Sequence, residues 1–219
     1  MKIYLLPGLG YDCRIFENLD FKDWDVKCLN WIEPNQNEGL NQYAKRMFGD
    51  ALNTKDKVVL IGHSLGAIVA QEIATVTKIE KIILISSIKS RQELPRRFKV
   101  IAPLQLHKLF TKELGIKTIK YWGEKHGFEN SIERELFKSM IGNQTNKYLQ
   151  WALKALSRWK TPILPKETSI FQVHGTHDKT FPLKLIKSPN ALIKNGSHIM
   201  LYNQYQELNK ILLEEIKTA

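Results

Sequence analysis

The segment Gly62-His63-Ser64-Leu65-Gly66 holds a serine between two glycines, at the boundary between a strand-like and a helix-like stretch of sequence. A run rich in β-branched residues precedes it, and helix-forming residues follow it directly. In a strand–Gly-x-Ser-x-Gly–helix turn, a side chain at either flanking position would collide with the neighbouring strand or helix. The pattern therefore predicts that Ser64 sits on a strained turn with its hydroxyl presented as a nucleophile. A tight turn that happens to carry a serine is the alternative.

A serine hydroxyl attacks efficiently only when a base takes its proton and an acid orients that base. Two later segments supply such residues: HGTHD at 174–178 and NGSH at 195–198, each shortly after a predicted strand. Both segments are predicted to leave the carboxyl ends of parallel strands, where open α/β sheets gather their ligands. Asp178 and His198 are therefore candidates to act with Ser64, although 114 residues separate Ser64 from Asp178.

The other five histidines have weaker claims to a chemical role. We expect the histidine inside the serine turn to pack beside the nucleophile, and the two in the HGTHD segment to be structural. That pair has a spacing that suits a metal, but no further cluster of ligands completes a zinc site. The remaining two lie in a helical region and are expected to be solvated. In chain order these are His63, His174 and His177, then His107 and His126.

The elements that would position these residues follow from hydrophobic patterning. Short apolar runs alternate with amphipathic stretches, which is typical of βαβ units and a parallel sheet. The third and fourth runs are continuously apolar, as in central strands that are covered on both faces. The predicted strands are Lys2–Leu6, Asp25–Asn30, Lys57–Ile61, Ile79–Ser86, Ser169–Val173 and Asn190–Ile193. The predicted helices between and after them are Arg14–Asn18, Leu40–Leu52, Leu65–Thr75 and Asn203–Ile216.

About eighty residues without a strand signal separate the fourth and fifth predicted strands. We interpret this stretch, at about 89–166, as a helical cap inserted into a single domain that spans 1–219. It carries 17 Lys and Arg against 6 Asp and Glu, so the whole formal charge of +11 lies in it. An apolar stripe around Trp151 is expected to pack the last cap helix onto the domain below. The predicted cap helices are Glu93–Ile101, Leu104–Leu114, Ile116–Tyr121, Ser131–Met140 and Asn146–Trp159.

Composition narrows the class of protein. The apolar share of 43% and charged share of 25% are ordinary for a soluble globular protein. No stretch of 18 or more apolar residues indicates a membrane span, and the start of the chain is predicted to be a strand rather than a signal peptide. Cys13 and Cys28 form no metal-like or CxxC spacing. Since no signal peptide is predicted, we expect a cytoplasmic protein, and because the cytosol keeps cysteines reduced, we expect these two to be buried free thiols.

The three motifs GHSLG, HGTHD and NGSH, in this order, resemble those of the α/β-hydrolase family along essentially the whole chain. The resemblance implies a doubly wound, mostly parallel six-stranded sheet with the helical cap inserted after the fourth strand. Carried over by position, Ser64 is the nucleophile, Asp178 the orienting acid and His198 the general base. The backbone N–H groups of Leu9 and Leu65 would form the oxyanion hole, and neither a cofactor nor a metal is needed.

Two features depart from the family's pattern. The loop that would hold Leu9 carries Pro7-Gly8 where many relatives have His-Gly, which affects side-chain hydrogen bonding rather than the backbone donor. This loop also follows the first predicted strand, so the family's first two strands are expected to be absent and the sheet to be truncated at that edge.

The resemblance predicts a serine hydrolase that cleaves a carboxylic ester or thioester of a small molecule through an acyl-enzyme on Ser64. A non-catalytic small-molecule receptor on the same fold is the alternative. The basic cap suggests a substrate with an anionic portion, although merely solvated lysines and arginines explain it equally well. Nucleic-acid binding is not expected, because no nucleic-acid motif accompanies the charge. Substrate identity and oligomeric state are left open.

Overall fold

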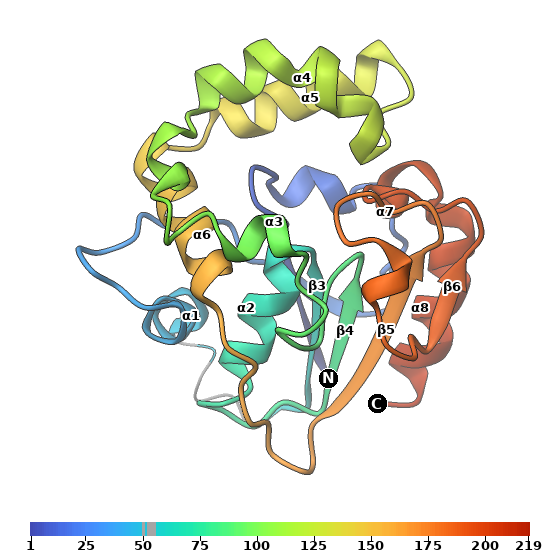
Figure 1. Cartoon of the computed structure of the whole chain (residues 1–219). Coiled ribbons are helices and arrows are strands. Elements are labelled where there is room, and N and C mark those ends of the chain that lie inside the picture. The colour runs from blue at the N-terminus through green and yellow to red at the C-terminus, as the bar shows by residue number, and fades with distance from the viewer. Residues whose placement is uncertain (50, 52–55) are drawn as a thin grey trace.

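The computed structural model describes residues 1–49, 51 and 56–219 and contains one six-stranded sheet (Figure 1). All strand pairs are parallel, in the order β2-β1-β3-β4-β5-β6. This confirms the predicted doubly wound parallel sheet. The strands are β1 (Lys2–Leu6), β2 (Asp25–Cys28), β3 (Val58–His63), β4 (Lys81–Ile85), β5 (Ser169–Gly175) and β6 (Ala191–Ile193).

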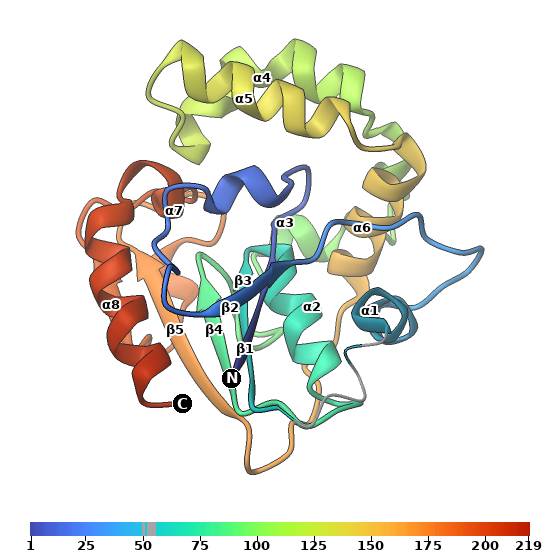
Figure 2. The same cartoon turned by 180° about the vertical axis from the view of Figure 1, so that it is seen from behind.

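Helices cover both faces of the sheet (Figures 1 and 2). The helices outside the cap are η1 (Cys13–Phe16), α1 (Leu40–Phe48), α2 (Leu65–Ile73), η4 (Leu183–Leu185), α7 (Met200–Asn203) and α8 (Tyr205–Lys217). The predicted helix over 40–52 thus begins where expected, and its last residue, Leu52, lies outside the described residues, as does Asp50.

The central strands divide their side chains between two apolar cores. Leu60 and Ile82 pack with α1 and α2, whereas Ile61 and Ile83 pack in the core that contains α8. All residues of β3 and β4 are buried. Successive side chains of a strand point to opposite faces, so a strand covered on both sides is apolar along most of its length. The carboxyl end of β3 is therefore held rigidly on both sides.

The segment between β4 and β5 is helical and lies over the carboxyl ends of the strands (Figure 1). We call residues 89–166 the cap. Both views show α4 and α5 side by side at its top (Figures 1 and 2). The cap helices are α3 (Arg96–Lys99), η3 (Leu106–Leu109), α4 (Lys112–His126), α5 (Ser131–Gly142) and α6 (Asn146–Arg158). Within the part of the chain that the structure describes, every helix is too short or too polar to span a lipid bilayer.

The predicted cap helix over 104–114 is wrong. Gln105 has a left-handed backbone (φ 55°), and Phe110 is extended, so the α-helical path is interrupted twice. Thr111 then begins α4 by accepting a hydrogen bond on its side chain from the backbone N–H of Leu114. A threonine N-cap is a local signal that was available in the sequence. The predicted helix over 116–121 is the middle of α4.

The apolar stripe of α6 packs onto the domain below, as predicted. Tyr148 and Trp159 are buried, and the ring of Tyr148 lies 5.1 Å from that of Trp31. The indole N–H of Trp159 donates to Glu72 Oε1 over 2.9 Å. The indole N–H of Trp151 donates to a backbone carbonyl of the loop before α1. These contacts tie the cap to the helices on one face of the sheet.

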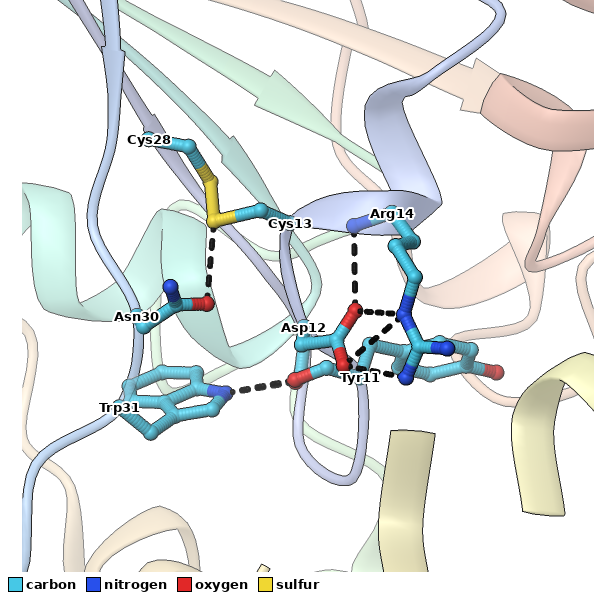
Figure 3. The surroundings of a disulfide bond; sticks show 8 residues. Tyr11, Asp12, Cys13, Arg14, Cys28, Asn30 and Trp31 are labelled. Atoms are coloured by element: carbon cyan, nitrogen blue, oxygen red, sulfur yellow. Dashed lines mark hydrogen bonds and ion pairs between the residues drawn. A yellow bond between two sulfur atoms is a disulfide. The ribbon is translucent and has the colours of Figure 1, made fainter. Parts of the chain in front are cut away.

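The expectation of two free thiols is wrong, because Cys13 and Cys28 form a disulfide (Figure 3). Cys28 ends β2, and Cys13 begins η1 after the loop that leaves β1. Pairing of β1 with β2 sets Leu5 opposite Cys28, and the loop returns Cys13 to within 5.9 Å between Cα atoms. This separation suits a disulfide. The 15-residue sequence separation alone does not reveal a contact that depends on strand pairing.

Candidate active site

The turn at Ser64 is strained as the motif predicts. Ser64 has φ 52° and ψ −118°, a region that L-residues rarely occupy. A Cβ on Gly62 would lie 2.3 Å from the backbone N of Ala67, and one on Gly66 would lie 2.1 Å from the carbonyl of Leu6. Both flanking positions therefore require glycine. The backbone N–H of Ser64 donates to the carbonyl of Ile85 on β4, which anchors the turn to the neighbouring strand.

The structure brings Ser64, Asp178 and His198 together at the carboxyl edge of the sheet. Asp178 Oδ2 lies 2.9 Å from His198 Nδ1, and His198 Nε2 lies 3.0 Å from Ser64 Oγ. Because a carboxylate only accepts hydrogen bonds, Nδ1 carries the proton in the first of these. With its proton on Nδ1, the ring leaves Nε2 free to accept the hydrogen bond of the Ser64 hydroxyl. All three residues are buried.

Asp178 is held as a carboxylate. Burial alone would raise its pKa, but the charge and hydrogen bond of His198 outweigh burial and hold the pKa below the ordinary value. The backbone N–H groups of Thr180 and Phe181 also donate to Oδ1, over 2.7 and 2.9 Å. With both oxygens engaged, the carboxylate can fix the tautomer and orientation of His198.

Three of the other histidines do not enter this chain of hydrogen bonds, although His174 Nε2 lies 3.6 Å from Asp178 Oδ2. His63 packs against the His198 ring, as predicted, and its Nε2–H donates to the His198 carbonyl over 2.9 Å. Burial lowers the pKa of His63 to about 3, so it stays neutral. His174 is buried and donates from Nε2 to the Phe181 carbonyl, and burial likewise lowers its pKa. His177 is exposed beside Thr176.

The loop after β1 forms a tight turn beside the serine. The N–H of Tyr11 donates to the carbonyl of Gly8, which leaves the N–H groups of the two central residues, Leu9 and Gly10, outside that bond. Gly10 has φ 81°, which glycine adopts readily. Leu65 is the first residue of α2, so its N–H has no acceptor within the helix.

Leu9 and Leu65 line the same cavity as Ser64 and His198. The indole N–H of Trp31 donates to the carbonyls of both Gly8 and Tyr11, over 3.1 Å each, and so supports the loop. Figure 3 shows the bond to Tyr11. Sequence reasoning missed Trp31, because it lies in an irregular segment with no motif of its own.

A cavity of about 400 Å³ separates the Ser64 hydroxyl from the cap. Apart from Ser64, His126 and His198, its wall is made of leucines, an isoleucine, aromatic rings and two threonines. None of its lining residues, all within the described ranges, is Lys, Arg, Asp or Glu. The lining residues from the cap are Phe98, Phe110, Leu114, Thr118, Trp122, His126, Phe137, Ile141, Leu153 and Leu156.

Both cap histidines were expected to be solvated, and this is wrong. His107 is buried. His126 lies in the cavity wall, its ring centroid 5.6 Å from that of His198. Burial, and next the charge of His198, lower the pKa of His126 to about 4. A signal existed: Leu114, Thr118, Trp122 and His126 recur every four residues, which places them on one face of a helix.

Comparisons with known proteins agree with this fold. The chain matches the model of the alpha/beta hydrolase family over residues 4–211. None of the curated proteins matches it by sequence. Similar folds occur in an epoxide hydrolase from Bacillus megaterium (TM-score 0.72, 13% identity, covering 99% of this chain and 93% of that one). An esterase from Exiguobacterium antarcticum has TM-score 0.71, 14% identity and coverage of 99% and 92%.

MenH from S. aureus is also similar, with TM-score 0.68, 15% identity and coverage of 100% and 94%. At these identities the likeness to solved structures shows the fold alone. The family model covers nearly the whole chain, from β1 into α8. The chain therefore belongs to the alpha/beta hydrolase family.

Proposed function

We propose that the protein is a serine hydrolase that cleaves an apolar carboxylic ester or thioester through an acyl-enzyme on Ser64. One observation carries the proposal: Ser64 Oγ, His198 Nε2 and Asp178 are joined by hydrogen bonds of 3.0 and 2.9 Å at the floor of an apolar cavity. Neither a cofactor nor a metal enters the reaction that we propose.

The proposed reaction has two halves. Ser64 Oγ attacks the substrate carbonyl carbon while His198 Nε2 takes the hydroxyl proton, and the oxyanion accepts hydrogen bonds from the Leu9 and Leu65 amides. The bond to the leaving alcohol or thiol breaks, and His198 gives it the proton. Water then attacks the acyl-enzyme, His198 takes the water's proton, and Ser64 regains it as the acid departs. Asp178 keeps the imidazole in the required tautomer throughout.

The cavity supports an uncharged acyl group as the part of the substrate bound beside Ser64. Its volume of about 400 Å³ is in the range of small-molecule pockets, and its wall offers no cation to pair with an anion. An anionic portion of the substrate stays a prediction, and it would have to lie outside the cavity. The choice between ester and thioester is equally a prediction.

Substitution of the nucleophile tests the proposal. Ser64→Ala should lower kcat for a nitrophenyl ester by about a thousandfold or more, because the three residues act as one unit. Ser139→Ala, on the exposed side of α5, serves as a matched control and should retain full activity. Thermal unfolding checks that both variants are folded, and ester turnover by Ser64→Ala at the wild-type rate would contradict the mechanism.

The receptor alternative is separated by the time course. A hydrolase reacts with a fluorophosphonate at Ser64 and, when left unlabelled, releases many product molecules per chain. A receptor that hydrolyses its ligand stops after about one equivalent. The cytoplasmic location stays a prediction, and the disulfide between Cys13 and Cys28 weighs against it. Disulfides are typical of oxidising compartments. We also propose that residues 1–219 form one domain with the cap inserted at 89–166.

A further inference from the structure

Exposed large apolar side chains are concentrated in one short part of the cap. Among the described residues, eleven such side chains are exposed, and five of them lie between residues 100 and 114. Their exposed fractions run from 43% to 69%. Scattered single apolar residues are normal on a protein surface, but a cluster indicates an interaction site. The five are Val100, Leu104, Leu106, Leu109 and Leu114.

Consecutive turns keep these five side chains close together. The N–H of Leu104 donates to the carbonyl of Val100, and the N–H of Leu106 donates to the carbonyl of Ile101. The segment then continues through η3 directly into α4. Its backbone is therefore compact, and its leucines are displayed to solvent rather than used to cover a core.

The same part of the cap is strongly cationic. Residues 96–125 contain eight Lys and Arg against two Glu. Six of the cations are exposed: Arg96, Arg97, Lys108, Lys117, Lys120 and Lys125. Within the described residues none of the eight forms an ion pair with a carboxylate. Tyr121, 69% exposed, lies among them on α4 and packs under Lys120.

This surface is continuous with the cavity over Ser64. Phe110 and Leu114 line the cavity, and Leu114 is also 44% exposed. The wall of the cavity thus reaches the protein surface within the apolar segment. A molecule that enters at this point passes from the leucine cluster to the candidate nucleophile without crossing a charged layer.

We propose that the exposed side chains of residues 96–125, here called the docking face, adsorb to an anionic lipid membrane, from which the enzyme takes its ester substrate. Leucines and a tyrosine surrounded by lysines and arginines are the composition of surfaces that lie in a membrane interface. A second copy of the chain fits less well, since two faces with this charge repel each other. Only the removal of substrate from the bilayer rests on the proposed function.

Vesicle binding tests the docking face independently of catalysis. The full chain and Ser64→Ala are sedimented with vesicles of phosphatidylcholine alone and of equal parts phosphatidylcholine and phosphatidylglycerol. Two double variants alter the docking face, Leu104→Ser with Leu109→Ser and Lys117→Gln with Lys120→Gln. Matched controls remove exposed residues elsewhere, Ile163→Ser with Leu192→Ser and Lys210→Gln with Lys217→Gln.

We expect the chain and Ser64→Ala to bind the anionic vesicles equally and the phosphatidylcholine vesicles much less. Each docking-face variant should bind the anionic vesicles about tenfold or more weakly, and each control should stay within about twofold. Hydrolysis of a short soluble ester should be unchanged in the docking-face variants, since none of the four residues lines the cavity.

Three results would overturn the proposal. The first is that the chain does not bind anionic vesicles. The second is that it binds phosphatidylcholine vesicles as strongly, and the third is that the control variants lose as much binding as the docking-face variants. Self-association that the leucine variant abolishes, without vesicle binding, would assign the face to a second copy instead. Because Ser64→Ala reports binding without turnover, loss of the proposed chemistry and loss of docking are separate outcomes.

Discussion

The strand-end loops and the cap form opposite sides of one cavity, and they are held in different ways. Ser64, Asp178 and His198 are buried, and each is fixed by directional hydrogen bonds to backbone or to one another. The opposing wall on α4 and α5 consists mostly of apolar and aromatic side chains, which fix no direction.

This difference assigns separate tasks to the two regions. A position held by several hydrogen bonds tolerates little displacement, as acid–base chemistry requires. A wall of leucines and rings can change shape by substitution without leaving a polar group unpaired. We therefore expect changes in the loops to alter the rate of the chemical step and changes in the cap to alter which substrate is accepted.

The sharpest test of this division between loops and cap compares two variants, Asp178→Asn in a loop and Leu153→Ala in the cap. Asp178→Asn loses the carboxylate that orients His198 and should lower kcat/KM by about a thousandfold to ten-thousandfold. Leu153→Ala, which enlarges the cavity from α6, should change the preferred acyl chain length while kcat falls less than about tenfold. Rates are measured over a series of nitrophenyl esters. Near-normal activity in Asp178→Asn would mean that the acid lies elsewhere.

The second prediction concerns the disulfide, which belongs to the loop side. Cys13→Ala with Cys28→Ala opens a covalent loop with a sequence separation of 15, which should cost about 3 kcal/mol of unfolding free energy. Urea unfolding measures this cost. Reduction of the wild-type chain should reproduce it, and the same reductant should leave the double variant unchanged. Equal stability of the two chains would mean that the bond does not support the loop that carries Leu9.

The two regions also differ in how far the sequence predicts them. All six strands match their predicted ranges to within two residues at each end, because their signals are local runs of apolar residues. The loops that follow them bring Ser64, Asp178 and His198 together for the same reason, since parallel strands end at one edge.

The failures depend on contacts between distant residues, on an overlooked helix cap, or on a local backbone conformation that the sequence does not specify. The Cys13–Cys28 bond requires the pairing of β1 with β2. The cap helices were misjudged at Gln105, whose left-handed conformation no neighbouring residue specifies, and at the Thr111 cap. The position of His126 against His198 depends on how α4 lies over the sheet, and helical periodicity indicates a buried face without naming what it faces.

The last prediction has the smallest expected effect. It tests whether His126 in the cap is held neutral above the active site. Burial lowers the pKa of His126 to about 4, against an ordinary value near 6.5. Between these two values the unfolded chain binds more protons than the folded one, so stability must fall as the pH is lowered from 7 to 5. We expect His126 to account for about 1–2 kcal/mol of that fall in the free energy of unfolding. Solvent in the cavity screens the charge of the protonated ring, and this reduces its contribution.

In His126→Phe, a ring of similar size keeps the packing against Trp122 but cannot bind a proton. The loss of stability between pH 7 and 5 should therefore shrink by about 1–2 kcal/mol, while His63, whose pKa is lowered to about 3, continues to contribute. His177→Gln, at an exposed histidine, should leave the difference unchanged. Urea midpoints at the two pH values give the comparison. If His126→Phe loses as much stability on acidification as the wild type, His126 is not held neutral above the active site, and the cap is a passive apolar wall.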